Sequence, residues 1–273
     1  MRSRSKIRSV EKISAVYGYS RQNYYERQRV SEEQRREEAE IIKAVQRIRQ
    51  RQPRVGVRKI HRMITIGVGR DRLYEILREA GLLVKRRKRY QKTTNSRHRF
   101  KKYENLIKDK LPGGPGEQHV SDITYLNTWE GYCYLSLITD RYSRKIVGHE
   151  LSRSLCLEGS LRALEKAIAG VEQPGRLIHH SDRGLQYCSN EYVKLLSSRG
   201  IKISMTEENH VYENALAERV NGILKDELLL GEMLPSYEIA KQMVEEAVKI
   251  YNEERLHMSI GYMTPQQKHL SLN

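Results

Sequence analysis

The feature that most constrains this chain's fold is a change of pattern at a proline- and glycine-rich segment, residues 111–116. Before it, apolar residues recur at helical spacing among many charged residues. After it, three successive runs are patterned as β-strands, at about 118–126, 132–139 and 144–151, with a hairpin turn between the first two. Strands in succession followed by alternating helices and strands predict an α/β fold for this part. The later helices are predicted at 157–169, 190–199, 213–229 and 237–254, and the later strands at 176–180 and 201–204.

The chain before this segment is predicted to be helical. Residues 11–29 read as two short helices around Gly18, with Ser20 as the N-cap of the second. In a DNA-binding helix-turn-helix, Arg21 would stand at the N-terminal end of the second helix, where base edges are commonly contacted. A helical hairpin that serves only for packing explains the same short pattern equally well.

Further helices are predicted up to the basic segment. A capping box at 31–34 is expected to open a long helix that runs to about Gln52. Residues 57–64 and 70–80, closed by Gly81, form a second candidate helix-turn-helix. The chain is therefore divided into a helical region, a second small helical region, a basic arm or linker, and the α/β part. Their predicted bounds are 1–52, 53–83, 84–115 and 116–273.

Positive charge is concentrated in the first part of the chain. Residues 1–110 contain 33 Lys and Arg against 12 Asp and Glu, net +21, whereas the remainder contains 17 against 22, net −5. A surplus this local predicts that the first part delivers the second to a polyanion such as nucleic acid. The basic arm begins with Lys85, Arg86 and Arg87, which are expected to contact DNA, although a disordered linker has a similar composition. A membrane surface is disfavoured, because no basic amphipathic helix carries an aromatic apolar face.

Cysteine usage and apolar content indicate the compartment. The three cysteines, Cys133, Cys156 and Cys188, form no C-x-x-C pair, so neither a disulfide framework nor a zinc ribbon is predicted. No run of about 18 apolar residues could span a membrane. We therefore expect a cytosolic protein with reduced cysteines.

Three carboxylates stand in contexts suited to holding a divalent metal. Asp122 lies within one apolar, β-rich run and Asp182 follows another, so both are expected on or at the end of strands. Glu218 lies in a helical stretch, and thirty-five residues separate it from Asp182. A single Asp of this kind is ordinarily an edge or turn residue, but the three together can converge on an oxygen-preferring cation such as Mg²⁺. Such cations drive phosphodiester chemistry.

The segments around these carboxylates resemble those of a known family. Ser121–Tyr125 (SDITY), His180–Tyr187 (HSDRGLQY) and Glu213–Glu218 (ENALAE) are similar to the catalytic segments of bacterial insertion-sequence DDE transposases. The group is the IS-three family, whose second reading frame encodes a core similar to retroviral integrase. The resemblance covers roughly residues 50–270 and includes the thirty-five-residue spacing. It implies a ribonuclease-H-like catalytic core preceded by a helix-turn-helix-type DNA-binding region.

The resemblance also implies an activity, a cofactor and partners. The expected activity is cleavage of DNA at the ends of a mobile element and transfer of the strands to target DNA. Two Mg²⁺ ions, or Mn²⁺ in their place, would be held by Asp122, Asp182 and Glu218, with Asp122 bridging the two. The chain would act as a homo-oligomer on DNA in the bacterial cytoplasm, in association with the nucleoid. The product of an upstream reading frame is a further expected partner.

A basic residue shares a helix face with Glu218. At 100° per residue, Glu218 and Lys225 lie within about 20° of each other. The opposite side of this helix is apolar and is formed by Leu216, Val220, Ile223, Leu224 and Leu228. The resemblance implies that a basic residue in the place of Lys225 contacts DNA near the reacting end, whereas an ordinary exposed pair is the alternative. Arg183, beside Asp182, is also expected to contact DNA.

Other interpretations remain open from the sequence. Asp140 could approach the carboxylates, but it precedes a turn, where Asp is common. His180 is a candidate for contact with substrate, while His119 and Glu213 replace the Trp and Asp that are usual in the family. A catalytically silent, sequence-specific DNA-binding regulator derived from a transposase is one rival function. A tyrosine recombinase is the other, suggested by 17 tyrosines, none of which has an evident nucleophile setting.

Overall fold

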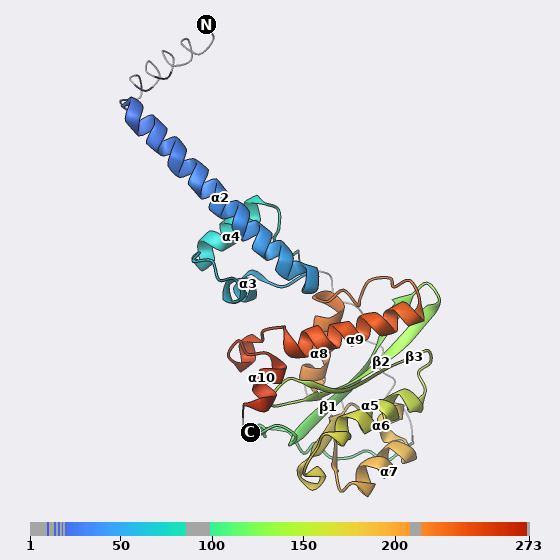
Figure 1. Ribbon diagram of the computed structural model, residues 1–273. Coiled ribbons are helices and arrows are strands. Elements are labelled where there is room, and N and C mark those ends of the chain that lie inside the picture. Colours follow the sequence, from blue (N-terminus) through green and yellow to red (C-terminus); the bar gives the residue numbers. More distant parts are fainter. Residues whose placement is uncertain are drawn as a thin grey trace. The chain divides into compact units, whose positions relative to one another are not determined.

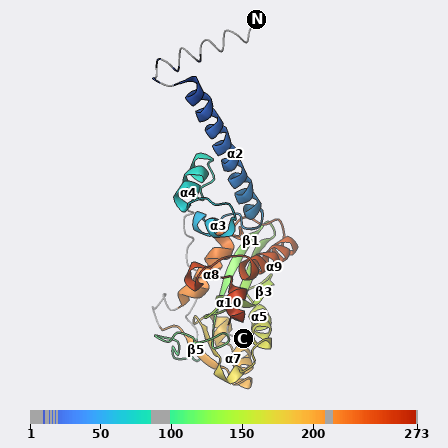
Figure 2. The ribbon, with the colours of Figure 1, turned by 60° about the vertical axis from the view of Figure 1, so that its left-hand side comes forward.

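The computed structural model describes residues 20–85, 99–207 and 214–271, together with Val10, Ser14, Val16 and Gly18. The chain divides into two compact units (Figures 1 and 2). One unit comprises residues 1–50 and 56–84, and the other comprises residues 51–55 and 85–273. Within the described ranges, no helix is long and apolar enough to cross a membrane.

The N-terminal unit is helical, as predicted. Its helices are α2 (Arg21–Arg51), α3 (Val57–Met63) and α4 (Arg70–Glu79). Its core is apolar: Ile60, Leu73 and Leu77 are fully buried, and Ile41 and Val45 of α2 are buried as well. The second predicted helix pair is therefore present, with bounds within one residue of those expected from the sequence.

The long helix differs from the prediction at Ser31. A capping box there would place a break between two helices, but α2 runs without interruption from Arg21 to Arg51. The residues around Ser31 are mainly Arg, Gln and Glu, which favour helix, and α2 contains neither Gly nor Pro. Ser20 does act as an N-cap, because its Oγ accepts a hydrogen bond from the Asn23 amide at 3.1 Å. The first predicted helix, residues 11–17, lies largely outside the described residues.

The second unit contains a five-stranded sheet, which confirms the predicted α/β class. Its strands stand in the order β3-β2-β1-β4-β5. They are β1 (Gln118–Thr128), β2 (Gly131–Asp140), β3 (Ile146–Ser152), β4 (Ile178–Ser181) and β5 (Lys202–Met205). The first three pair antiparallel, whereas β4 is parallel to β1 and β5 is parallel to β4. The parallel pairs follow from the helical connections that precede β4 and β5.

Helices cover both faces of this sheet. The helical elements are α5 (Leu157–Ala169), η1 (Pro174–Arg176), α6 (Leu185–Cys188), α7 (Asn190–Ser198), α8 (Ala215–Asp226), α9 (Tyr237–Glu253), η3 (Met258–Ile260) and α10 (Pro265–Leu270). One buried apolar cluster joins α8 and α9 to the sheet, and another joins α5, α6 and α7 to its other side (Figure 1). The helix predicted at 213–229 ends at Asp226, and Leu229 adopts a left-handed backbone with φ of 65°.

Residues that precede the proline- and glycine-rich segment pack on this unit. Ile107 is buried in a cluster with Val120 and Ala217. The Leu106 amide donates to Ser204 Oγ at 2.8 Å. The compact unit that holds the sheet thus includes chain from the predicted basic arm and begins before residue 111.

Candidate active site

Strand register places two of the three carboxylates side by side. Asp122 lies within β1, and Asp182 is the residue that follows β4. These strands are parallel neighbours, and Ser121 of β1 pairs with Ser181 of β4, so the two aspartates stand at the same level. Adjacent strands are about 4.8 Å apart. The predicted strand positions of both aspartates are therefore present in the fold.

Glu218 approaches the same pair from a helix. It lies in the first turn of α8, which packs against β1. The apolar side of α8 faces the core through Val220, Ile223 and Leu224, as its periodicity predicts. Glu218 is on the exposed side of the helix, so its carboxylate is free of the packing that holds α8 on the sheet.

The electrostatics of Asp122 indicate that Asp182 and Glu218 act on its carboxylate. The pKa of Asp122 is raised to about 7, mainly by burial, then by the charge of Asp182 and to a smaller extent by that of Glu218. Hydrogen bonds from the Ile123 amide and from Asn221 act in the opposite direction. Two acids that oppose the ionisation of a third form a cluster of negative charge, and a bound cation would reduce the repulsion among them.

Two further residues hold the aspartates in place. Asn221 Nδ2 donates to Asp122 Oδ2 at 2.8 Å, and Asn221 stands three residues after Glu218, on the neighbouring turn of α8. The Gly184 amide donates to Asp182 Oδ1 at 2.9 Å. A Cβ at Gly184 would lie only 2.9 Å from that oxygen, so any larger residue would shift the Asp182 carboxylate. The sequence analysis missed both residues; the i+3 spacing of Asn221 from Glu218 was the available signal.

The donor set fits a hard divalent cation. All three acids offer carboxylate oxygens, the ligands that Mg²⁺ prefers, and the charges of Asp182 and Glu218 oppose ionisation of Asp122. Among the residues that the structure describes, no three His, Cys, Asp or Glu side chains are close enough to form a complete metal site. The exposed Glu218 can change rotamer to close the set, because its side chain is not packed.

Lys225 lies beside these carboxylates. Its Nζ is 4.6 Å from the centroid of the Tyr125 ring, on β1. Burial lowers the pKa of Lys225, while the charges of Asp122 and Asp226 raise it. The half-buried amine is therefore held against β1 and differs from a freely solvated lysine, in agreement with the helical geometry that placed it on the side of Glu218.

Comparison with known proteins identifies the family. Two family models, both described as integrase core domain, match residues 112–210 and 199–265. Over 200 residues the chain is 36% identical to the insertion element IS600 uncharacterized 31 kDa protein of Shigella sonnei, covering 72% of this chain and 74% of that one. It is 33% identical over 193 residues to the transposase InsF for insertion sequence IS3A of Escherichia coli strain K12, covering 70% and 67%. This chain belongs to the IS3 (IS-three) family of insertion-sequence DNA transposases.

A solved structure agrees with this assignment at the level of the fold. The cryo-electron microscopy structure of the simian T-cell lymphotropic virus intasome in complex with the PP2A regulatory subunit B56 gamma matches with a TM-score of 0.50. The match is 20% identical in sequence and covers 80% of this chain and 71% of that one. The sheet and helices of the transposase therefore have the ribonuclease-H-like architecture of integrase cores.

The remaining predicted DNA contacts of the transposase are spread over the chain. Arg183 Nε donates to the Thr206 carbonyl at 2.7 Å, which joins the loop after β4 to the end of β5. Lys85 is exposed, and Arg21 is the first residue of α2. Arg86 and Arg87 lie outside the described residues.

Two histidines near the site are structural. His179 Nε2 contacts Ser121 Oγ at 3.1 Å and Tyr192 OH at 3.0 Å. His180 Nδ1 contacts Ser204 Oγ at 2.8 Å, and His180 is fully buried, so the suggestion that it touches substrate is wrong. Burial lowers the pKa of His179 to about 3 and that of His180 to about 4, which keeps both rings neutral at pH 7.

Asp140 has a turn role, as its sequence context indicated. The side chain is fully buried and accepts hydrogen bonds from the Ser143 amide at 2.7 Å, the Ser143 hydroxyl at 2.6 Å and the Gly116 amide at 2.8 Å. These donors satisfy its carboxylate within the β2–β3 turn. Asp140 is therefore not a member of the carboxylate cluster.

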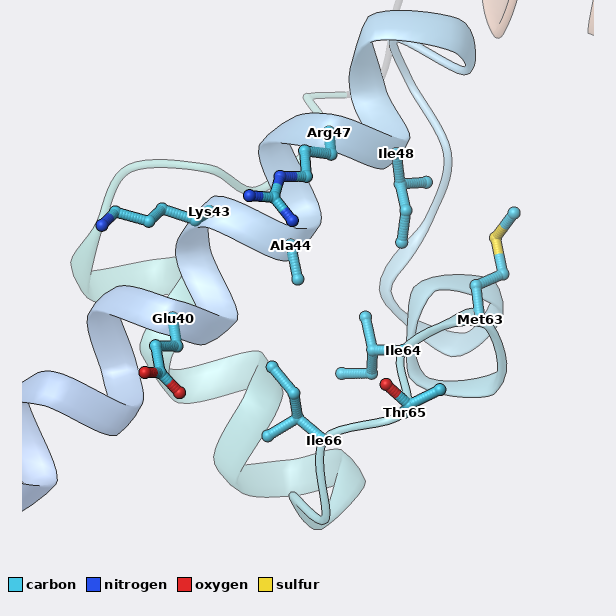
Figure 3. Close-up of a pocket in the computed structure, with 9 residues that line it drawn as sticks. All are labelled: Glu40, Lys43, Ala44, Arg47, Ile48, Met63, Ile64, Thr65 and Ile66. Carbon is cyan, nitrogen blue, oxygen red and sulfur yellow. The ribbon is translucent and has the colours of Figure 1, made fainter.

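Two cavities in the described chain have linings that do not include the carboxylates. A cavity of about 460 Å³ in the N-terminal unit has an apolar interior, in which Ala44 and Ile48 of α2 face Ile64 and Ile66 (Figure 3). Another, of about 420 Å³, is lined in part by His119, beside the β2–β3 turn. Neither is lined by Asp122, Asp182 or Glu218.

Proposed function

We propose that this transposase binds the ends of its own mobile element and cleaves and joins DNA strands with two Mg²⁺ ions held by Asp122, Asp182 and Glu218. The observation that carries the proposal is the register of β1 and β4, which sets Asp122 and Asp182 at one level, with the helix of Glu218 packed on β1. Mn²⁺, another oxygen-preferring cation, is expected to substitute.

The chain's own residues prepare the site for a phosphodiester. When bound, the divalent ions supply positive charge to the attacking and leaving oxygens. Asp122, on which the charges of both other acids act, would contribute to both ion positions. Asn221 keeps Asp122 Oδ2 oriented, and the Gly184 amide keeps Asp182 Oδ1 oriented, so that neither aspartate must be reorganised when substrate arrives.

DNA positioning is assigned to basic residues. Lys225, beside Asp122, contacts a phosphate near the reacting end. Arg183, Arg21, Lys85, Arg86 and Arg87 contact phosphates or bases elsewhere along the DNA. The transposase acts as a homo-oligomer that holds the element's ends and the target DNA, with the product of an upstream reading frame as a further partner.

The carboxylate assignment is tested by substitutions that preserve shape. Asp122→Asn, Asp182→Asn and Glu218→Gln each remove a metal ligand, and each is expected to reduce cleavage and joining by more than about 100-fold, the scale on which electrostatic groups act in catalysis. Glu165→Gln, an exposed acid on α5, is the matched control and should keep wild-type activity. Purified proteins are assayed on DNA that carries the element's ends, with Mg²⁺.

The same experiment separates the proposal from its rival. A regulator without catalysis would bind the ends and show no Mg²⁺-dependent cleavage in the wild-type chain. A variant that keeps more than a few per cent of wild-type cleavage would remove its residue from the site.

A further inference from the structure

An exposed aromatic surface lies at the tip of the β1–β2 hairpin. Trp129 is 76% exposed, Tyr132 is 64% exposed, and Met233, from the segment between α8 and α9, is 56% exposed. Backbone hydrogen bonds tie that segment to the hairpin, since the Trp129 amide donates to the Leu234 carbonyl and the Leu234 amide donates to the Asn127 carbonyl. We call Trp129, Tyr132 and Met233 the hairpin patch.

Ring and cation–π contacts join Tyr132 of this patch to Lys225, on which the charge of Asp122 acts. The rings of Tyr132 and Tyr125 meet edge to face, with centroids 5.7 Å apart and planes at 85°. Lys225 Nζ lies 4.6 Å from the Tyr125 ring centroid, and Lys225 is attracted by the charge of Asp122. The series therefore runs from a proposed metal ligand, through a cation, to two aromatic rings.

The charges around the patch favour an anionic, aromatic ligand. The acid in the hairpin turn, Glu130, is paired with Arg153 at 3.2 Å and accepts a hydrogen bond from the Tyr237 amide. Its negative charge is thus offset by the Arg153 guanidinium. The nearest cation to these rings is Lys225, whose Nζ lies over the Tyr125 ring and carries the positive charge that a phosphate would meet.

We infer that the hairpin patch is a stacking surface for unpaired bases of the DNA that enters the carboxylate site, an inference that rests on the proposed function. Bases stack on exposed aromatic rings regardless of sequence, and a cation beside the rings holds the backbone. A partner with a purely aliphatic surface would gain no specific interaction from exposed ring faces beside a cation. The ligand is a segment in which the two strands are separated, because paired bases present their edges and not their faces.

The register of the hairpin predicts which nucleotides are bound. Tyr132 pairs with Asn127, five residues along β1 from Asp122. At about 3.4 Å per residue this corresponds to about 17 Å along the strand. Stacked nucleotides rise about 3.4 Å each on one strand. The stacked base is therefore expected about five nucleotides or fewer from the reacting phosphodiester.

Intrinsic fluorescence tests the inference directly, because Trp129 is the only tryptophan of the chain. The full chain is titrated without divalent cations, so that DNA is not cut, with three probes: a single strand of the element's terminal sequence, its duplex, and an abasic strand of equal length. We expect the single strand to quench Trp129 emission strongly and the abasic strand to quench it weakly at equal saturation. Equal quenching by both strands, or none by either, would overturn the inference.

Substitutions supply a second measurement. Tyr132→Ala and Trp129→Ala should each weaken binding to DNA with unpaired ends by about 5- to 150-fold, the range for one stacked base, and should leave binding to blunt duplex unchanged. Tyr132→Phe should retain most of the affinity. Tyr142→Ala is the matched control, since Tyr142 lies under Lys268 at 4.4 Å in the β2–β3 connection.

The outcomes distinguish this inference from the proposed function. Loss of affinity for unpaired ends in the hairpin variants, with the Tyr142 control unaffected, supports the stacking surface even if no cleavage is found. Normal binding and joining by Trp129→Ala and Tyr132→Ala contradict the stacking surface and leave the carboxylate assignment intact. A patch that drives self-association of the chain without any DNA-dependent quenching also contradicts it.

Discussion

At the scale of single residues, the surroundings of Asp122 oppose the ionisation of its carboxylate. Its pKa is raised to about 7 because its carboxylate is buried and faces Asp182 and Glu218. Asn221 partly offsets this by donating to Oδ2. Because Asp122 is a proposed metal ligand, binding of the cation and ionisation of Asp122 are expected to be coupled.

This coupling predicts a pH-dependent gain of stability in Asp122→Asn. The folded pKa of about 7 exceeds the unfolded value of 3.8, so folding favours the protonated acid. Below pH 3.8, Asp122 is protonated in both the folded and the unfolded chain, and its contribution to the free energy of unfolding is at its most favourable. This contribution is lost as the pH rises through the folded pKa of about 7. Without divalent cations, Asp122→Asn should therefore raise the free energy of unfolding by on the order of 2 kcal/mol at pH 8 and by much less at pH 4.

Denaturant unfolding at both pH values measures this difference. Added Mg²⁺ should stabilise the wild type at pH 8 and have little effect on Asp122→Asn. A variant that is less stable than the wild type at pH 8 without metal would contradict the assigned repulsion.

Lys225 offers a second prediction at the residue scale. Lys225→Ala should weaken binding to the element's ends by roughly 1 to 3 kcal/mol, the scale of a charge-assisted hydrogen bond, and should lower joining strongly. Lys225→Arg should retain part of both, because the charge remains while the geometry changes. End binding and joining are measured for both variants. A solvated lysine with no phosphate contact would leave the binding of Lys225→Ala at the wild-type level.

At the scale of elements, the loop after β4 and helix α8 position the acids. Gly184→Ala would force a Cβ to within 2.9 Å of Asp182 Oδ1 and should displace that carboxylate. We expect cleavage to fall by at least about tenfold, which corresponds to about 1.4 kcal/mol in the barrier, with little loss of DNA binding.

Gly222→Ala is the control for a glycine substitution near the acids. No atom lies within 4 Å of a Cβ at this position of α8, and the change should stabilise the helix by about 0.5 to 1 kcal/mol. Thermal unfolding and cleavage are measured for both variants. Normal cleavage by Gly184→Ala would show that Asp182 does not depend on the close approach.

At the scale of the whole molecule, the distribution of positive charge divides DNA binding between two segments. Residues 1–84 contain 21 Lys and Arg against 10 Asp and Glu, net +11, and residues 85–102 add ten Lys and Arg without an acid, which brings the total to +21. The N-terminal unit ends at Val84, so a fragment of residues 1–84 keeps that unit whole.

This division predicts the salt dependence of binding. If fragment 1–102 makes about six phosphate contacts, the logarithm of its binding constant should fall against the logarithm of salt concentration with a slope near −5. Fragment 1–84 should show a distinctly shallower slope, because it lacks half of the surplus charge. Fluorescence anisotropy over a range of salt concentrations measures both slopes. Equal slopes would show that the basic arm does not contact DNA.

The sequence by itself determined the kind of element that each segment forms. The spacing of apolar residues along the sequence differs between β1, a strand, and α8, a helix. In α8, apolar residues three and four positions apart predict which side of the helix is buried. The resemblance in the segments around Asp122, Asp182 and Glu218 also led to the correct family before any distance was known. Such signals are local, since they depend on residues within a few turns of one another.

Only the tertiary structure decided which of these residues meet. Asn221 and Asp122 are 99 positions apart, and their hydrogen bond depends on the packing of α8 against β1. The contacts of Lys225 with Tyr125 and of Ile107 with Val120 are likewise long-range. A local pattern carries no information about strand order or register, because these are set by the burial of whole apolar faces and by hydrogen bonds between distant strands.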